Sequence, residues 1–410
     1  MPVNETPSVT RSVNRDDISQ DEQWALDFSC PNHADVPALE LGRSLQSMPR
    51  MIYVSNHALL AFPEGSWVPT RRSDIIDVLK SPELFSSDPG HFSFSSIINE
   101  TWRLPPIEYD PPQHSKFRKA LQPVFTADQV AISRDKVKMI ADEILQSLFN
   151  GRRCEVIGDF ARPFAMQVLL TYLGLPLATW SHMAALHTTV VHDSNRDNAA
   201  SAVNELKLLF ANILKSDAHS SGTMIHRIRQ LRDSGDWTIE ESVAGCMLMF
   251  IAGFDTMVAM IGLQVRYLAM HLDRQSQLRA NPGLIRGAVH EMIRIFPIVN
   301  AFRRATHETE LAGVKIRRGD WVLVSTPIAT ADDLHVDDCT IINFNCPRRS
   351  DISFGYGIHR CLGLHLAKLE LEVAIHSLLA TLPAFHITAL TNSPVVAGRI
   401  HSVESLDISW

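Results

Sequence analysis

The ten residues from Phe354 to Gly363 carry the strongest chemical signal in the chain. They place Cys361 and His359 among three glycines, and the leucine- and alanine-rich segment 364–375 that follows predicts a helix. Glycines before a helix let the backbone turn tightly and approach a bulky group. The free amides and the dipole at a helix start favour a thiolate over a thiol. A thiolate beside a glycine-lined slot suits a large planar metal cofactor.

Two other interpretations of Cys361 are open at this point. A free cysteine is most often a buried core thiol. Cys361 could also be part of a zinc site, whose other candidate ligands are His359, His365, Cys339 and Cys346. The zinc interpretation is the weaker one, because neither a Cys-x-x-Cys pair nor a histidine pair at zinc-finger spacing accompanies these residues.

The same ten residues resemble the haem-binding signature of the cytochrome P450 monooxygenases, Phe-Gly-x-Gly-x-His-x-Cys-x-Gly, at every fixed position. The resemblance implies that Cys361 is the axial thiolate ligand of the iron of haem b, with Phe354 and Gly355 beside the macrocycle. It also implies a mainly α fold with small β-sheets, in which a triangular prism of helices holds the haem between a long central helix and the helix after the cysteine loop.

An acid and an alcohol, Asp255 and Thr256, lie in the middle of a long apolar segment that predicts a helix over 239–272. Burying them is costly unless they are hydrogen-bonded. In one interpretation Thr256 bonds to its own helix carbonyl and Asp255 pairs structurally. In the other, Gly253 lets the helix open and makes room for dioxygen and water.

The segment 252–256 matches the Ala-Gly-x-Asp-Thr oxygen-activation motif of the P450 family. The resemblance implies that Thr256 orders water beside the iron and that Asp255 supplies protons from bulk solvent. This assigns the catalytic roles to these two residues.

Four basic residues stand where the resemblance implies contacts to the haem propionates, which need cationic or hydrogen-bonding partners. His114 and Arg118 match the family pattern Asp-Pro-Pro-x-His-x-x-x-Arg and share one helix face. Arg303 stands at the spacing of another propionate-binding arginine, and His359 supplies a fourth contact.

Glu291 and Arg294, at positions i and i+3 of a predicted helix, and Arg348 match the Glu-Arg-Arg triad of the family. We interpret them as a buried structural ion network and not as catalysts. Two residues depart from the bacterial pattern: Asp351 replaces a common histidine, and Ala301 stands where the camphor enzyme has an acid. Both changes could alter the packing around one propionate.

The substrate is expected to be a small hydrophobic molecule, such as a terpenoid, with at most one or two polar groups. The residues that the resemblance places over the haem are mostly apolar, as suits a site that binds by burial: Trp102, Leu248, Ala252, Val299, Ala301 and Ile400. Trp102 could donate one hydrogen bond. Arg399 would select a carboxylate if it pointed inward, but we expect it to be surface charge.

The resemblance is closest to the camphor monooxygenase group, which implies electrons from an iron–sulfur ferredoxin with its reductase, and dioxygen as co-substrate. An acidic ferredoxin suits a basic patch on an otherwise acidic protein, whose net charge is −7. The basic residues near the two helix starts on the Cys361 side are Lys116, Arg118, Lys119, Arg360 and Lys368. The net charge also argues against nucleic acid as a partner.

The helices and strands that must position these residues are predicted to cover most of the 410-residue chain. We expect a flexible polar N-terminus over 1–20 and a single domain over 21–410, mainly helical, with strand-rich parts near 50–72, 310–326 and 383–410. A short helix over 73–80 should be capped by Ser73.

The cellular location is expected to be the cytoplasm, without membrane attachment. The first twenty residues are polar and lack an apolar signal core. The apolar segment 243–263 contains Asp255, so it predicts a buried core helix and not a membrane span. Six scattered cysteines do not form a disulfide framework.

The leading hypothesis is therefore a haem-thiolate monooxygenase that inserts one atom of dioxygen into a C–H bond. A peroxygenase driven by hydrogen peroxide is the first alternative, and a non-catalytic haem-thiolate sensor or binding protein is the second. Neither alternative needs the acid–alcohol pair, so Asp255 and Thr256 favour the monooxygenase.

Overall fold

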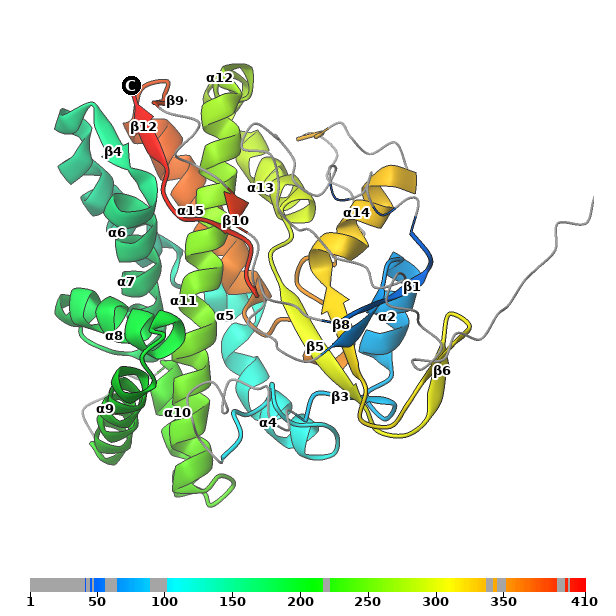
Figure 1. The fold of residues 1–410 in the computed structure, drawn as a ribbon. Helices are drawn as coiled ribbons and strands as arrows, with labels where there is room; N and C mark the ends of the chain where they lie inside the picture. Colours follow the sequence, from blue (N-terminus) through cyan, green and yellow to red (C-terminus); the bar gives the residue numbers. More distant parts are fainter. Residues whose placement is uncertain are drawn as a thin grey trace, which may run out of the picture.

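The structure is a computed structural model that describes residues 41, 45, 48–55, 65–88, 102–216, 222–336, 342–344, 352–388, 395–396 and 399–410. A helical part is built around one long central helix, and a smaller part rich in strands lies beside it (Figure 1). The fold is mainly α with small sheets, as the sequence predicts. The predicted polar segment 1–20 lies outside the described residues.

Helix α11, Ile239–Met270, is the long central helix. Thr238 and Glu241 begin it with a capping box, in which each side chain accepts a hydrogen bond from the backbone N–H of the other residue. Among the described residues it is the one helix long and apolar enough to cross a membrane, but 72% of its most apolar window is buried inside the protein. It is therefore consistent with a core helix.

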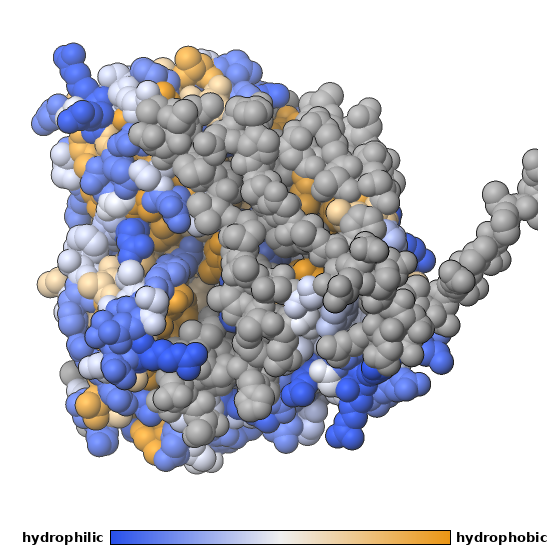
Figure 2. All heavy atoms as spheres, viewed as in Figure 1, coloured by the Kyte–Doolittle hydropathy of each residue, from blue (hydrophilic) through white to orange (hydrophobic). Residues whose placement is uncertain are grey.

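On the face in Figure 2 the described surface is largely hydrophilic, with hydrophobic residues between the polar ones.

The other helices of this part pack around α11 and share its hydrophobic core, which we call the large core. Most of their bounds follow the predicted segments. They are α4 (Gln113–Leu121), α5 (Ala127–Ala131), α6 (Arg134–Leu148), α7 (Arg162–Leu173), α8 (Trp180–His192), α9 (Arg196–Lys215), α10 (Met224–Asp233), α12 (Leu272–Ala280), α13 (Ile285–Ile295) and α15 (Leu364–Thr381).

A five-stranded sheet in the order β1-β2-β8-β5-β3 forms the centre of the strand-rich part. Strands β2 and β8 are parallel and the other neighbours are antiparallel. Buried residues of the sheet and of helix α2 form a second hydrophobic cluster, the small core. The strands are β1 (Met51–Val54), β2 (Ser66–Pro69), β3 (Phe85–Ser86), β5 (Asn300–Ala305) and β8 (Trp321–Ser325).

The remaining strands form small sheets at the edges. Strands β6 (Thr309–Leu311) and β7 (Val314–Ile316) make a hairpin, and both residues of its turn are left-handed, Ala312 at φ 50° and Gly313 at φ 82°. The tail contains strands as predicted: β9 (His386–Ile387), β10 (Val395–Val396), β11 (Ser402–Val403) and β12 (Asp407–Ser409), of which β12 lies between β4 (Arg153–Glu155) and β9.

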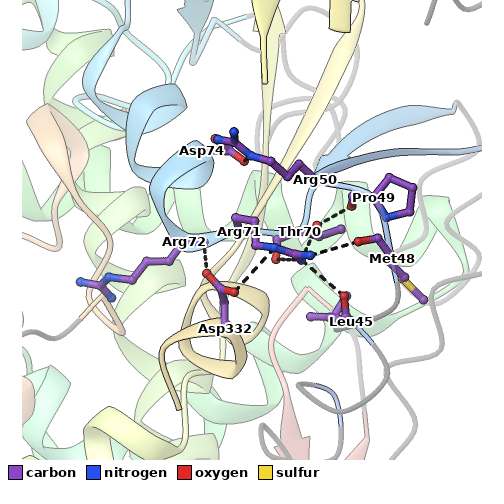
Figure 3. Close-up of polar contacts among 9 residues, drawn as sticks. All are labelled: Leu45, Met48, Pro49, Arg50, Thr70, Arg71, Arg72, Asp74 and Asp332. Atoms are coloured by element: carbon purple, nitrogen blue, oxygen red, sulfur yellow. Dashed lines mark hydrogen bonds and ion pairs between the residues drawn. The ribbon is translucent and has the colours of Figure 1, made fainter. Parts of the chain in front are cut away.

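Helix α2, Arg72–Lys80, begins differently from the prediction. Ser73 is not its N-cap, because the helix already includes Arg72 and its cap residue Arg71 makes no side-chain capping bond. The backbone N–H of Arg72 donates instead to Oδ2 of Asp332 at 2.8 Å, on helix α14 (Thr326–Val336) (Figure 3). A carboxylate from a distant helix thus supplies the cap, which local sequence spacing does not reveal.

Candidate active site

The loop before α15 holds Cys361 through its backbone. The N–H of Cys361 donates to the carbonyl oxygen of Phe354 at 2.9 Å, and the N–H of Gly355 donates to that of Ile352 at 2.7 Å. These two bonds fold the segment into a compact turn in which Cys361 precedes the first residue of α15, Leu364. The sequence motif therefore forms one rigid unit around its cysteine.

Two glycines of this loop adopt backbone conformations that other residues rarely adopt, Gly355 at φ 74° and Gly357 at φ 69°. A Cβ at Gly357 would also lie 2.2 Å from the backbone carbonyl oxygen of Leu79 in α2. The loop thus approaches α2 so closely that only glycine fits at this position.

Burial raises the pKa of the Cys361 thiol above its ordinary value, although the Gly363 N–H, Arg118 and Arg360 act in the opposite direction. The sequence-based expectation that the helix start alone favours the thiolate is therefore too simple. A buried thiol of this kind ionises when a metal ion replaces the proton. The Gly363 N–H and the positive charges of Arg118 and Arg360 then stabilise the Cys361 thiolate.

Four basic side chains gather beside this loop, as the sequence predicts. The rings of His114 and His359 contact each other edge-on with centroids 4.5 Å apart. His359 also lies near Arg118 and Arg303, whose charges and the burial of its ring lower its pKa to about 2. Burial likewise lowers the pKa of Arg303 to about 10.

This cluster lacks a matching anion among the described residues. Asp110 acts on Arg303 and His114, but its carboxylate already accepts hydrogen bonds from Ser86 Oγ and from the Ser87 N–H. The Nε2 atoms of His114 and His359 are buried and have no hydrogen-bond partner within the described part of the chain. Buried polar atoms are normally satisfied, so the site fits a ligand that brings two carboxylates.

Asp255 and Thr256 lie on α11, which continues without a break through both residues. Thr256 Oγ1 donates to the carbonyl oxygen of Ala252 at 2.9 Å. The expected local opening at Gly253 is not present: a Cβ there would lie 2.9 Å from Cδ1 of Leu169 in α7. Close packing of α11 against α7 is therefore the physical reason for this glycine.

Two histidines of α8 hold the Asp255 carboxylate, and sequence reasoning missed both. His192 Nε2 lies 2.7 Å from Oδ2 of Asp255, and His187 Nδ1 lies 3.7 Å from Oδ1. Their positions are more than sixty residues from Asp255 in sequence, so spacing gives no hint of the contact. Only the recurrence of histidine at positions 182, 187 and 192 could have drawn attention to them.

Glu291 and Arg294 form a buried ion pair on α13. Arg294 Nε and Nη2 donate to the two carboxylate oxygens of Glu291 at 2.9 and 2.6 Å, and the side chains are only 5% and 1% exposed. Two parallel bonds of this kind are the strongest geometry available to an arginine. Arg348, the predicted third member, and Asp351 lie outside the described residues.

The six predicted pocket residues come from separate elements, and the structure brings some of them together. Val299 forms an isolated bridge with Ile400, and Ala301 follows two residues later on β5. Leu248 and Ala252 lie one turn apart on α11. Trp102 packs against the large core, and the ammonium group of Lys207 lies 5.4 Å from its ring centroid.

Arg399 is placed differently from the expectation of simple surface charge. Its side chain is partly buried, and burial lowers its pKa. Its carbonyl oxygen accepts a hydrogen bond from the Asn300 N–H at 2.9 Å, beside the Val299–Ile400 bridge. The backbone of Arg399 therefore lies beside predicted pocket residues, and its side chain is not on an open surface.

A cysteine loop before one helix, a basic cluster beside that loop and an acid–alcohol pair on the central helix are the features of a haem-thiolate type of site. Comparisons with known proteins agree. The chain is 32% identical over 360 residues to the probable cytochrome P450 127A1 of Sinorhizobium fredii, covering 84% of both chains. It is 28% identical over 356 residues to the vitamin D3 dihydroxylase of Streptomyces griseolus, covering 84% of this chain and 88% of the relative.

Among solved structures, CYP101J2 matches with a TM-score of 0.84 and 23% identity, covering 97% of this chain and all of that one, which shows the common fold. No protein-family model matches the chain. The chain belongs to the cytochrome P450 family. It is an oxidoreductase that incorporates oxygen, and the predicted resemblance to bacterial members, with camphor-group enzymes among the structural neighbours, is confirmed.

Proposed function

We propose that the protein is a haem b-dependent monooxygenase that hydroxylates a small hydrophobic substrate with dioxygen and electrons from a ferredoxin and its reductase. Bound haem would supply the redox chemistry of oxygen activation. Cys361 would hold the iron from one side. The observation that carries the proposal is the buried basic cluster with two unpartnered imidazole nitrogens beside the Cys361 loop.

The four bases would bind the propionates and so fix the orientation of the haem plane. The bases come from both parts of the fold, since His114 and Arg118 lie on α4 and Arg303 on β5. Charge-assisted hydrogen bonds are stronger than neutral ones, and a buried cluster that lacks an anion gains most from them. Phe354 and Gly355 would contact the macrocycle from the loop.

Asp255 and Thr256 would move protons on the opposite side of the haem. The Thr256 hydroxyl donates to Ala252, so its oxygen can accept a hydrogen bond from an ordered water or a reacting group. Asp255 is largely shielded, with a side chain 14% exposed, and contacts the more exposed His192. The pair can therefore connect the site interior to solvent.

The binding of carbon monoxide tests the assignment of Cys361. The reduced protein with carbon monoxide should show the strongly red-shifted absorption typical of thiolate ligation, and Cys361→Ala should lose it. Cys154→Ala is the matched control, because Cys154 is a buried cysteine whose pKa burial raises to about 12. Retention of the band in Cys361→Ala would refute the assignment.

The proposed substrate is compact and mostly apolar, because the pocket candidates Leu248, Val299 and Ile400 offer burial and few polar groups. The name of the vitamin D3 dihydroxylase indicates a largely apolar substrate for that relative. The partly buried Arg399 would favour a carboxylate if it faced the pocket.

A screen for spin-state shifts should compare a neutral terpenoid with a carboxylic acid of similar size, and repeat both with Arg399→Ala. Binding of the acid alone, lost in the variant, would contradict the neutral substrate.

The electron donor would dock on the Cys361 side, over the basic residues near the starts of α4 and α15. Arg360 is exposed just before α15, and Lys119 is exposed in the last turn of α4, not at its start. Lys116 contributes less than the sequence suggests, because its ammonium group lies 3.1 Å from a carboxylate oxygen of Glu241.

We also propose a cytoplasmic location, a single domain over 21–410, and Arg348 as third member of the Glu291–Arg294 network.

A further inference from the structure

The outer side of Asp255 is held by a histidine that solvent can reach. His192 Nε2 lies 2.7 Å from Asp255 Oδ2, and the side chains are 55% and 14% exposed. His192 is the last residue of α8, where the helix dipole favours a positive charge. An exposed imidazole on one side thus meets a shielded carboxylate on the other.

The inner side of Asp255 faces a histidine whose protonation is fixed by a backbone carbonyl. His187 Nε2 lies 3.1 Å from the carbonyl oxygen of Ile251, which can only accept a hydrogen bond, so this nitrogen carries the proton. Burial lowers the pKa of His187, which keeps the ring neutral. Its Nδ1 is therefore a lone-pair acceptor, 3.7 Å from Asp255 Oδ1.

One further charge faces this group. Arg162, at the start of α7, lies with its guanidinium 5.1 Å from the ring centroid of Phe254 and acts on Asp255 and on both histidines. The hydrogen bond to Asp255 raises the pKa of His192. Burial acts to raise the pKa of Asp255, but the hydrogen bond from His192 and the charges of His192 and Arg162 lower it. The raised pKa of His192 and the lowered pKa of Asp255 both favour an imidazolium beside a carboxylate as the starting state.

We propose that His192 is the solvent-side proton carrier for the Asp255–Thr256 pair. It is a positioning residue that acts through Asp255, and the inference rests on the proposed role of that pair. The N–H bond at His192 Nε2 breaks and an O–H bond forms at Asp255 Oδ2. The neutral imidazole then takes a proton from water, and no electrons are transferred. Protonation of Asp255 also removes the repulsion between its carboxylate charge and the lone pair of His187 Nδ1, which faces Oδ1 at 3.7 Å.

The test compares His192→Gln, His192→Lys and the control His182→Gln in the holoenzyme. Glutamine can keep a hydrogen bond to Asp255, but its amide does not release or take up a proton in the physiological pH range. Lysine keeps the ion pair but titrates far above neutral pH. His182, also on α8, is 64% exposed and lies 2.8 Å from Glu205, so it is a similar pair without contact to Asp255.

Turnover is measured from about pH 6 to about pH 9 with the compound that gives the largest spin-state shift in the screen. Wild-type turnover should fall as pH rises through the raised pKa of His192, because the imidazolium is the donor. Both His192 variants should lose this step, and His192→Gln should lower turnover about tenfold. His182→Gln should keep the wild-type profile. A wild-type profile in His192→Gln, or in His192→Lys, would overturn the proposal, the latter because it would indicate a purely structural ion pair.

A second readout does not depend on turnover. In the reduced, carbon monoxide-bound holoenzyme, the histidine ring resonances give the pKa of His192 directly, assigned by its loss in His192→Gln. The midpoint should lie above the ordinary value and return to it in Asp255→Asn; an ordinary midpoint in the wild type would contradict the proposal. If Asp255→Asn itself leaves turnover unchanged, the proposed role of Asp255 fails. If Asp255→Asn slows turnover and His192→Gln does not, this inference alone fails.

Discussion

The imidazole ring of His359 meets that of His114 edge-on, with centroids 4.5 Å apart and ring planes at 66°, although the two residues are brought together from the Cys361 loop and helix α4. Both rings are kept neutral by burial and by neighbouring positive charge. Each therefore has one N–H to donate, and both unsatisfied Nε2 atoms lie in the same basic cluster.

Replacing His359 by phenylalanine should weaken retention of the haem. The ring shape is kept, but one hydrogen bond to a propionate is lost, which is worth about 1.5 kcal/mol, or roughly tenfold. Transfer of haem to an excess of an acceptor protein measures the rate of loss. His365→Phe, at an exposed position of α15, is the control and should not change the rate. Equal rates in both variants would remove His359 from the propionate site.

Thr256→Ala and Asp255→Asn should separate electron consumption from product formation. We expect the first to divert reducing equivalents to hydrogen peroxide, since the hydroxyl that orders water is lost. The second should slow turnover, because the carboxylate next to His192 no longer carries protons. Consumed reductant, peroxide and product are measured together. Unchanged rate and coupling in both variants would favour the peroxygenase or the sensor.

Gly253→Ala should have two opposing effects, because overpacking of α11 against α7 costs about 1–3 kcal/mol and the higher helix propensity of alanine offsets about 1 kcal/mol of that. The new Cβ would lie 2.9 Å from Leu169 Cδ1. Truncating Leu169 to alanine should therefore cost less in the Gly253→Ala background than in the wild type. Urea unfolding of the two single variants and the double variant gives the coupling. Additive effects would show that Gly253 has a role other than packing.

Reduction by an acidic ferredoxin should slow as ionic strength rises, because exposed charges are screened beyond about 8 Å at physiological salt. Arg360→Glu should lower the association rate constant and reduce its salt dependence. Arg153→Glu on β4 is the control, because this arginine is also exposed but its strand pairs with β12 and belongs to neither α4 nor α15. A rate that responds neither to salt nor to Arg360→Glu would exclude this docking surface.

The stability of the protein should decrease in mild acid because of His401. Burial lowers its folded-state pKa to about 4, and its Nε2 lies 3.0 Å from Asn300 Nδ2. The unfolded chain takes up a proton near pH 6.5 and the folded chain does not, so the stabilisation present at neutral pH is lost as pH falls from about 6.5 towards 4. At pH 5 this group should account for about 2 kcal/mol, measured by urea unfolding. His401→Gln keeps an acceptor without titrating and should flatten the dependence; an equal slope would contradict the assignment.

The sequence predicted much of the fold because helical periodicity and turn glycines are local signals. The boundaries of α11 and the strands β1 and β2 agree closely with the predictions. Helix α14 was missed, since its first residues directly follow the apolar strand β8 and resemble its continuation. The capping of α2 by Asp332 was also missed, because it depends on a contact between residues 260 positions apart.

The candidate site was predictable where function depends on fixed spacing, as in the Cys361 loop and the Asp255–Thr256 pair. The packing role of Gly253 was not, because the neighbour that requires it, Leu169, lies on another helix. The same holds for His192 and His187, whose importance comes only from the geometry of α8 against α11. Local sequence patterns identify the reactive groups, and contacts between distant segments determine the pKa and the orientation of those groups.

The absence of a side chain at Gly357 has a consequence for how the protein loses its cofactor. The residues around Cys361 rest on the backbone of α2, which belongs to the small core and not to the large one. The position of the Cys361 loop is therefore set in part by a neighbour that belongs to the smaller of the two cores. Partial unfolding of the small core by heat or denaturant would release the iron ligand while the helical part is still folded. The haem absorbance would then decrease before the helical content does.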